Sequence, residues 1–492
     1  MNSNQADTTP TGFKDVRYSD LVCIGTGLSG IGLGAQLKRK LKFESMHFYD
    51  RNESYSGTWW SNHYPGAACD VPSILYSYSF HQNPHWSRFS AGYKEIQDYI
   101  TSVVQKYKLD RHMTFLTECQ EARWDEDRCI WKLRLQDLTT GETFVHECRI
   151  FISGVGTLVD PNIPSIPGAN TFRGEQFHSA RWRDDIALQG KNVVVIGNGS
   201  SANQLVPALQ PQVGKLTQII RSSQCTARQT LFLLTEAGWP LLFTTRVGGW
   251  MRQITEKLYR DYIVANAPKK YHEILIPKHH FACKRRVYDT NFQNMNVLKA
   301  DNFELIKDGI VCMTEGGIQT TNSFYPADVI VYATGFQTNG GFGKLRVYGK
   351  NGVWLDEHWN QMGGRSAYET IAVHGFPNFF MLYGPNGGTA HTSILLMIEN
   401  QIVAVIKVIR PVLQNRATVI EIKKAAYEKY TRDIQAACKK LVTNTSACTN
   451  WYITSTGWNG TVYPWSQMYY SWRCAFPTWS DWEYKVSKLI RV

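Results

Sequence analysis

Two glycine-patterned segments of the chain have the spacing of loops that hold the pyrophosphate of a dinucleotide. The first, "DLVCIGTGLSGIGLGAQLKRK", places Gly25, Gly27 and Gly30 between a short apolar run and a pattern compatible with a helix. In such a loop the first glycine permits a tight turn, the second lets the backbone approach the phosphates, and the third lets the helix pack on the strand. Asp50 ends the next apolar run, "SMHFYD", 20 residues after Gly30. We expect its carboxylate to accept hydrogen bonds from ribose hydroxyls; the plainer alternative is a solvated aspartate at a strand end.

The second segment, "KNVVVIGNGSSANQLVPAL", repeats the pattern with Gly197, Gly199 and Ala202. The apolar run that follows, "LTQIIRSS", carries Arg221 where the first unit carries Asp50, 19 residues after Ala202. A carboxylate repels a 2'-phosphate, whereas a guanidinium can bind it through two hydrogen bonds. The second loop is therefore predicted to prefer NADP(H) over NAD(H), unless Arg221 is an ordinary surface arginine.

Each of these loops needs the same supporting elements: a buried strand, a turn, a helix and a second parallel strand. The sequence thus predicts an α/β fold with two Rossmann-like dinucleotide-binding domains. One acidic and one basic site in a single chain fit FAD and NADPH as the cofactors, so we expect a protein that transfers electrons. A late apolar run, "ADVIVYATGF", is predicted to be a strand from which the chain returns between the domains.

Composition sets limits on the class of protein. The 492 residues are 43% hydrophobic and 19% charged, which is typical of a soluble globular enzyme of roughly three domains. The formal charge of +12 comes without a long Lys/Arg run, so nucleic acid is not an expected partner. The 11 cysteines are scattered without a Cys-x-x-Cys pair, which argues against a disulfide framework and against a zinc or other metal site. No signal peptide or membrane span is apparent, and we expect a cytoplasmic location.

A third segment, "FRGEQFHSARWRDD" at residues 172–185, has too many charges for a strand and too many rings for a plain linker. It resembles the F-x-G-x-x-x-H-x-x-x-W fingerprint of the Baeyer-Villiger monooxygenases, with Phe172, Gly174, His178 and Trp182 at the fingerprint positions. Arg183 departs from that family's usual Pro or Asp after the tryptophan.

A second signature of the same family is matched by "SGTWWSNHYPGAACD", in which Ser56 replaces the usual Ala or Gly. The matching residues are Gly57, Trp59, Tyr64, Pro65, Gly66 and Asp70. With both glycine loops, the resemblance runs from about Asp20 to the C-terminus.

The resemblance implies roles for further residues. The segment "FACKRRVYDTNF" is similar to the one that supplies the family's active-site arginine, which aligns with Arg285, with Arg286 as the alternative register, and Asp70 would be its partner. Lys284 would share the 2'-phosphate with Arg221. A helix N-terminus near residues 389–393 would face the flavin ring. The remaining positions expected to bind a cofactor are Thr58, Trp60, Cys69, Tyr76, Ser200, Ser201 and Ser222.

His178 has two possible roles, general base or part of a hinge between the nucleotide units. The hinge is favoured, because the residue lies about 20 residues before the NADP loop in a connecting segment. Phe172 and Trp182 would then anchor the segment by burying their rings.

The activity that the resemblance implies is insertion of one oxygen atom of O2 next to the carbonyl of a ketone, giving an ester or lactone. Arg285, protonated at any working pH, would stabilise the negative charge that develops. Two alternatives stay open: a related flavin monooxygenase that oxygenates nitrogen or sulfur or hydroxylates, and a non-oxygenating FAD/NADP-binding redox protein. Neither the substrate nor the oligomeric state can be read from the sequence.

The resemblance also divides the chain. The FAD domain is expected at residues 1–165 and 340–492, the NADP domain at 166–222 and 283–339, and a helical insertion at 223–282. The C-terminal tail at residues 451–484 holds 12 aromatic residues. These rings either line a pocket for a bulky hydrophobic or natural-product ketone, or pack the tail onto the FAD domain.

Overall fold

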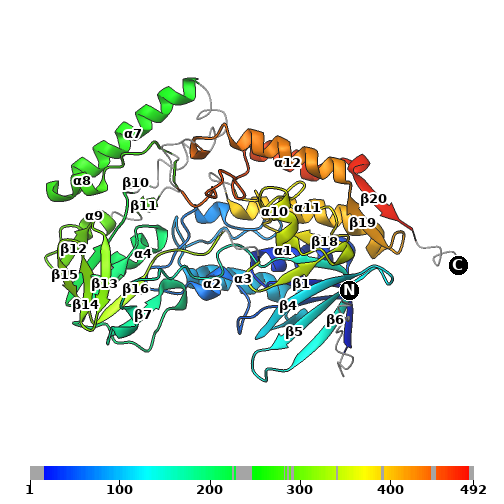
Figure 1. The fold of residues 1–492 in the computed structure, drawn as a ribbon, viewed down its shortest axis with the longest axis horizontal. Helices are drawn as coiled ribbons and strands as arrows, with labels where there is room; N and C mark the ends of the chain where they lie inside the picture. The colour runs from blue at the N-terminus through cyan, green and yellow to red at the C-terminus, as the bar shows by residue number, and fades with distance from the viewer. Residues whose placement is uncertain are drawn as a thin grey trace, which may run out of the picture.

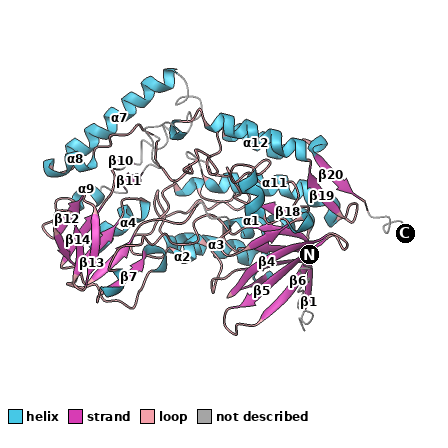
Figure 2. Cartoon of the chain, viewed as in Figure 1, coloured by secondary structure: helices cyan, strands magenta, loops and turns pink. Residues whose placement is uncertain are grey.

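The structure, a computed structural model, describes residues 16–223, 226–228, 246–281, 283–284, 287–289, 293–338, 342–388, 393–444 and 450–486. Its strands form two main sheets that lie on opposite sides of the molecule (Figure 1). Helices cover both sheets, and long loops fill the space between them (Figure 2).

The first sheet has the order β17-β4-β5-β6-β1-β2-β3, with β18 paired to β6. Strand β1 pairs in parallel with β2 and β6, whereas β4, β5 and β6 form an antiparallel meander. The residues 21–24 of β1 are buried on both faces, which explains why "LVCI" reads as an unbroken apolar run. The strands are β1 (Val16–Ile24), β2 (Met46–Tyr49), β3 (Met113–Thr114), β4 (Thr117–Asp125), β5 (Ile130–Asp137), β6 (Thr143–Ser153), β17 (Arg346–Tyr348) and β18 (Phe379–Met381).

Helices α1 (Leu28–Leu41), α3 (Tyr93–Tyr107) and α11 (Ile394–Leu413) pack together beside this sheet. The short helix α2 (Thr58–Ser61) lies between α1 and α3 in the chain.

The second sheet is wholly parallel, with the order β12-β9-β8-β16-β7. Apolar side chains are buried on both of its faces, one cluster around Val193 and Val195 and another around Val194 and Ile330. Its strands are β7 (Glu175–His178), β8 (Asn192–Ile196), β9 (Lys215–Ile219), β12 (Phe303–Ile306) and β16 (Val329–Tyr332), with α4 (Ser200–Leu209) and α9 (Gln293–Val297) alongside. A small antiparallel sheet follows, formed by β13 (Ile310–Thr314), β14 (Gly317–Thr320) and β15 (Phe324–Pro326).

The remaining elements belong to the long connections and the tail. Helix α7 (Arg246–Asn266) lies apart from the sheets at the upper left of Figure 1 and is followed by α8 (His272–Leu275). The others are β10 (Thr226–Arg228), β11 (Val287–Asp289), α10 (Leu355–Gln361), β19 (Val419–Ile422), α12 (Lys424–Cys438), α13 (Gln467–Ala475) and β20 (Trp482–Lys485).

The predicted α/β fold with two Rossmann-like units is confirmed, because each glycine loop follows a parallel strand and opens a helix. One local prediction is wrong. Residues 175–178 of the charged segment do form a strand, β7, which among the described strands pairs only with β16, at the sheet edge. Charged residues are tolerated there because Glu175 and Gln176 face solvent while Phe177 and His178 are buried. The domain boundaries themselves stay predictions.

Two features bear on the limits set by composition. Across the described parts of the chain, no helix is both long and apolar enough to cross a bilayer. Cys283 is disulfide-bonded, although the scattered cysteines gave no sign of a crosslink, and the other cysteines that the structure describes are free thiols. The carbonyl of Cys283 accepts a hydrogen bond of 3.0 Å from Asn450, so this point also contacts the tail.

The aromatic tail mostly packs onto the first unit. Arg473 of α13 forms an ion pair with the buried Glu369, and the hydroxyl of Tyr470 donates to the carbonyl of Glu369 at 3.0 Å. Strand β20 pairs with β19, and Trp482 packs edge-on against Tyr368 at 5.8 Å between centroids. Trp451, at the start of the tail, instead lines the cavity reached by the two glycine loops. A role of the tail rings at a substrate stays a prediction.

Candidate functional site: one cavity shared by two glycine loops

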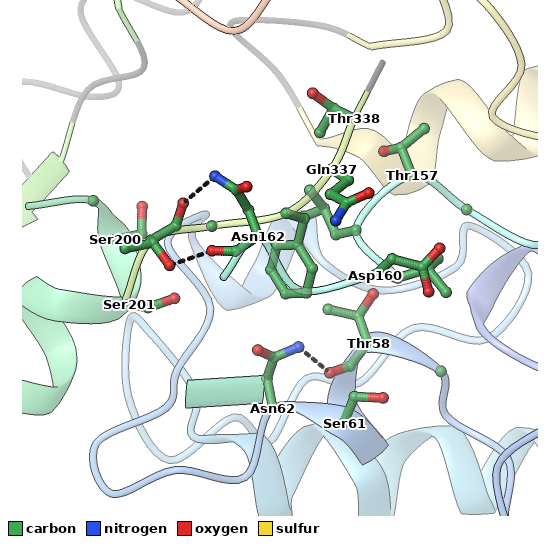
Figure 3. A pocket seen from close by; sticks show the side chains of 18 of the residues that line it. Thr58, Ser61, Asn62, Thr157, Asp160, Asn162, Ser200, Ser201, Gln337 and Thr338 are labelled. Carbon is green, nitrogen blue, oxygen red and sulfur yellow. Dashed lines mark hydrogen bonds between the residues drawn. The ribbon is translucent and has the colours of Figure 1, made fainter. Parts of the chain in front are cut away.

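Both glycine loops open into one cavity of about 1070 Å³. Figure 3 shows the side chains of Thr58 and Ser61 of α2, of Asn62 directly after it, and of Ser200 and Ser201 at the start of α4 on its walls. The cavity is also lined by most of the predicted cofactor-binding residues: Gly25, Gly27, Asp50, Gly57, Thr58, Trp59, Cys69, Asp70, Tyr76, Gly197, Gly199, Ser200, Ser201, Arg221, Ser222 and Lys284. Gly30, Trp60 and Ala202 do not line it.

The first loop needs its glycines for close approach. Gly25 has a φ of 108°, and a Cβ there would lie 2.4 Å from the carbonyl oxygen of Gly154. A Cβ on Gly30 would lie 2.1 Å from the carbonyl oxygen of Gly25, so Gly30 serves helix packing and has no need to face the cavity. Gly27 is the N-cap residue of α1, and the free N–H groups of that helix end therefore begin at the cavity wall.

The carboxylate of Asp50 orders this loop. One oxygen accepts hydrogen bonds from the backbone N–H and the hydroxyl of Thr26, both at 2.8 Å. The other accepts from the backbone N–H and the side-chain amide of Asn52, both at 2.9 Å. Asp50 therefore fixes the shape of the loop in addition to its predicted place at a ribose.

A second glycine segment closes over the first. Gly57, the N-cap of α2, has a φ of 52°, and a Cβ there would lie 2.8 Å from the Cα of Gly27. Only two glycine backbones can meet so closely. Ser56, at the position where the family signature has Ala or Gly, adopts a φ of 89°, a strained value for a residue with a side chain. Trp59 follows with its indole N–H donating to the hydroxyl of Tyr76 at 3.1 Å.

The two glycines of the second loop have different surroundings: Gly199 faces open space, and Gly197 packs against the protein backbone. A Cβ on Gly197 would lie 2.2 Å from the carbonyl oxygen of Ala333, whereas a Cβ on Gly199 would meet nothing within 4 Å. Gly199 is the N-cap of α4, and Ser200 and Ser201 form its first turn beside the cavity. Ala202 is fully buried against the second sheet. The arrangement fits the pyrophosphate role predicted from the spacing.

Two cationic side chains lie at the end of this site. Arg221 follows β9, is exposed, and lines the cavity. Lys284 also lines the cavity and donates a 2.9 Å hydrogen bond to the hydroxyl of Ser222. Asn198 holds the same turn by donating to the Ser222 carbonyl at 3.1 Å. Arg221 and Lys284, 63 positions apart in the chain, are thus brought to one turn, as a shared 2'-phosphate requires.

Asp70 lies where the two units meet. The Ser200 hydroxyl is 3.4 Å from its Oδ2, so the carboxylate contacts the first turn of α4. Its predicted partner Arg285, and the alternative Arg286, lie outside the described residues, as do residues 389–392 at the helix start predicted to face the flavin. Helix α11 begins at Ile394 with the Ser393 hydroxyl accepting from the backbone N–H of Leu395.

The loop that carries Asp70 is clamped to α4 by Gln204. The Tyr64 hydroxyl donates to Gln204 Oε1 at 2.7 Å, and Gln204 Nε2 donates to the carbonyl of Ala68 at 2.8 Å. A Cβ on Gly66 would lie 2.3 Å from the Gln204 carbonyl oxygen. Burial raises the pKa of the Tyr64 hydroxyl to about 12, so the phenol stays a proton donor at neutral pH. The loop at residues 64–70 of the first unit is therefore bonded to α4, the helix that follows the second glycine loop.

The fingerprint segment wraps around the edge of the second sheet. Phe172 is buried on one face of the sheet, and Trp182 on the other, where it packs edge-on against Phe177 at 5.2 Å between centroids. A Cβ on Gly174 would lie 2.5 Å from the Phe172 ring, so only glycine fits beneath that ring.

His178 is buried on the edge strand and does not line the cavity. Its Nδ1 accepts from the backbone N–H of Ala180 at 3.1 Å, and burial lowers its pKa to about 4. The residue is therefore neutral at neutral pH, and its ring packs edge-on against Phe336 of the cavity wall at 5.5 Å between centroids. This placement is compatible with the predicted hinge, and the role of His178 stays a prediction.

Arg183, which stands where the fingerprint has Pro or Asp, forms a bidentate ion pair with Asp185 on the surface. Its Nε and Nη2 donate to the two carboxylate oxygens at 2.7 and 2.6 Å. Both side chains are exposed, so the substitution changes the surface and leaves the buried rings of the segment in place.

The two chain crossings between the units form another wall of the cavity. Asn162 donates its backbone N–H to the Gly335 carbonyl at 2.9 Å, and Gln337 donates to the Asp160 carbonyl at the same distance. The Asn162 side chain also donates to the Thr334 carbonyl at 3.5 Å. Backbone hydrogen bonds thus hold the two crossings side by side.

Several wall residues carried no signal in the sequence. Gln204 stands outside the glycine motif, and Trp451 was one of many tail aromatics. Arg365 lines the cavity, donates to the Thr338 carbonyl at 3.0 Å and lies 5.2 Å from the Trp359 ring. Burial lowers the pKa of this guanidinium. Long-range packing brings Arg365 and Trp451 to the site, and Gln204 acts there because residues 64–68 pack against α4, so no local pattern could have identified these roles.

Two sheets, one mixed and one parallel, whose glycine loops and helix N-termini share one cavity define a two-dinucleotide α/β protein. Comparison with known proteins gives the family. Residues 73–345 match the model of the flavin-binding monooxygenase-like family, and the chain belongs to this family.

Curated relatives agree over most of the chain. A Baeyer-Villiger monooxygenase of Pseudomonas aeruginosa is 31% identical over 89% of this chain and 86% of its own. One of Streptomyces coelicolor is 32% identical over 89% of this chain and 87% of its own. Among solved structures, an oxidized steroid monooxygenase bound to NADP matches with a TM-score of 0.83 at 25% identity, covering 96% of this chain and 100% of that one.

Proposed function

We propose that this chain is an FAD-dependent, NADPH-consuming Baeyer-Villiger monooxygenase that inserts one oxygen atom of O2 beside a ketone carbonyl. The observation that carries the proposal is the single cavity reached by both nucleotide loops, with Asp70 at their junction. Membership of the flavin-binding family and the two curated relatives with this activity support the flavin and the reaction. The steroid monooxygenase bound to NADP supports the second cofactor.

The residues present fit both dinucleotides. Gly27 and Gly57 meet through their backbones, which leaves a cradle without side chains at the N-terminus of α1. Gly199 faces open space at the N-terminus of α4, and Arg221 with Lys284 supplies positive charge for a 2'-phosphate. When bound, FAD supplies the electron transfer and oxygen activation that no side chain can perform.

The protein's own part is to orient, to exclude water and to stabilise negative charge. Asp70 is proposed to orient the Arg285 guanidinium, which stays protonated and compensates the charge that develops on oxygen. Gln204 holds the loop that carries Asp70 against α4. The position of the Asp70 carboxylate is therefore set by both nucleotide-binding units.

For the substrate we propose a bulky hydrophobic ketone. Phe342, Tyr383 and Trp451 present rings to the cavity, and apolar residues from several elements complete its lining. A preformed, largely apolar cleft with a few polar groups is the usual environment for such a ligand. The cytoplasmic location stays an expectation, and no oligomeric state is proposed.

The test is oxygenation under 18O2. The purified flavoprotein is incubated with NADPH and a panel of cyclic and bulky ketones, amines and sulfides, and products are identified by mass spectrometry. We expect one labelled oxygen in an ester or lactone, formed only with NADPH. Labelled N-oxides or sulfoxides in place of esters would assign the related monooxygenase activity. NADPH oxidation without any labelled product would contradict the proposal in favour of a non-oxygenating redox protein.

A further inference from the structure

Helix α13 exposes a row of large apolar side chains that the proposed activity does not use. Met468, Tyr469, Trp472 and Phe476 are 84%, 44%, 54% and 66% exposed, and we call this set the aromatic face. The rings are continuous: Tyr469 and Trp472 stack at 6.1 Å between centroids, and Trp472 and Phe476 lie 6.4 Å apart. Isolated exposed apolar residues need no explanation, but a contiguous group of this kind marks an interaction surface.

The opposite side of α13 is firmly held. Tyr470 is fully buried, with its hydroxyl 2.7 Å from that of Thr370. Ser471 pairs with Asn400 of α11 at 2.8 Å, and the Ser466 hydroxyl caps the helix by accepting from the Tyr469 N–H. The helix therefore cannot roll to bury its outer rings without breaking these contacts. The aromatic face is a fixed surface.

Positive charge borders this face. Lys407 of α11 donates to the carbonyl of Ala475 at the end of α13, and its Nζ lies 5.8 Å from the Phe476 ring. Lys40 is close enough to Arg39 and Lys407 that, after burial, their repulsion lowers its pKa. Glu399 opposes these cations in part, but it is buried and accepts hydrogen bonds from Ser79. On α13 itself, Arg473 is paired with Glu369.

We propose that the aromatic face docks this protein onto an anionic lipid surface. Tryptophan and tyrosine side chains are enriched at the headgroup level of a bilayer. Methionine and phenylalanine side chains can insert between the headgroups and the acyl chains. The cations at the border and the formal charge of +12 are complementary to acidic headgroups. Apolar contact and positive charge together are the two signals that reversible membrane binding requires.

A second copy of the chain is the less suitable occupant. Two such faces paired about a twofold axis would bring Lys407 of both copies into one interface, because Lys407 lies beside the Phe476 ring. Like charges brought together at an interface oppose association, whereas an anionic surface relieves the same repulsion.

The experiment is sedimentation of the full-length protein with vesicles of phosphatidylcholine, with and without phosphatidylserine, at low and high salt. Catalysis is not needed for this readout, so it stands apart from the test of the reaction. We expect binding to the acidic vesicles that weakens at high salt. Trp472→Ser is expected to reduce binding about ten-fold, because a ring loses its place in the interface. Lys407→Gln is expected to reduce it about five-fold on acidic vesicles only.

The matched control is Trp250→Ser on α7, which removes a tryptophan that is 64% exposed away from the face. It is expected to bind vesicles like the unaltered protein. Met468→Asp serves as a second variant, since its side chain is 84% exposed and its replacement leaves the packing of α13 intact. FAD content verifies the fold of each variant.

Three results would overturn the proposal. They are the absence of vesicle binding, equal binding by Trp472→Ser and Trp250→Ser, and a concentration-dependent dimer in sedimentation velocity that Met468→Asp dissociates. The last result would assign the aromatic face to a second copy.

Discussion

Replacing Gln204 by methionine tests how the two units cooperate at the site. Gln204 joins α4 to the loop that carries Asp70 through two short hydrogen bonds, of 2.7 Å from the Tyr64 hydroxyl and 2.8 Å to the Ala68 carbonyl, and a long one of 3.4 Å from the Ala68 backbone N–H. Methionine has a similar volume, so Gln204→Met removes all three bonds without leaving a cavity, and the two short bonds account for most of the expected cost.

The expected cost follows from what is left unpaired. A buried polar group that loses its partner costs about 1–3 kcal/mol, so two such groups set a range of about 2–6 kcal/mol. Ser201 also interacts with the Tyr64 hydroxyl and can keep it partly satisfied. We therefore expect Gln204→Met to destabilise the protein by about 2–3 kcal/mol. The ester formed per NADPH consumed is also expected to fall, because the Asp70 loop is no longer held against α4.

The assay is urea unfolding of the flavin-loaded protein, with the yield of ester per NADPH measured in parallel. Gln212→Met is the matched control, because Gln212 donates to the Ala208 carbonyl at 2.8 Å on the exposed side of the same region. Its effect is expected to stay within about 0.5 kcal/mol. If both variants behave alike in both measurements, the clamp does not position the site and the reasoning is refuted.

Three further predictions concern charge. Arg221→Gln is expected to lower kcat/KM about 10- to 100-fold with NADPH and to leave it unchanged with NADH, because only NADPH has a 2'-phosphate; equal losses in steady-state kinetics would contradict this. Arg285→Ala is expected to slow ester formation at least about 100-fold while FAD stays bound; near-full oxygenation measured by product analysis would exclude Arg285 as the catalytic arginine. Burial lowers the pKa of His146 to about 3 and of His47 to about 4, so both are neutral in the folded protein. In the unfolded chain each histidine has a pKa of about 6.5, so below that pH only the unfolded state takes up the protons. The free energy of unfolding therefore falls with pH, by about 1.4 kcal/mol per pH unit for each histidine. Urea midpoints at pH 7 and pH 5 measure this loss, and His146→Gln is expected to remove about half of it; an unchanged pH dependence in that variant would contradict the assignment.

The sequence alone determined the parts of the site that rest on local patterns. Gly25 and Gly197 were identified because a tight turn after an apolar strand needs glycine at a fixed spacing. The positions of Asp50 and Arg221 followed because the next parallel strand ends at a predictable distance from each loop. These contacts lie within about 30 residues of chain, a range over which strand, turn and helix geometry is set by neighbours in sequence.

Tertiary structure alone decided the rest. Gln204 bonds to Tyr64, 140 positions away in the chain, and Asn450 bonds to Cys283, 167 positions away. No periodic pattern in the sequence predicts contacts between residues so far apart. Residues 175–178 of the charged fingerprint form a strand because they pair with β16 at the edge of the sheet, where Glu175 faces water. The tail aromatics were alike in sequence, yet Tyr470 is buried and Trp472 is exposed. Their difference arises because α13 has one side against α11, and which side that is depends on the packing of the whole fold.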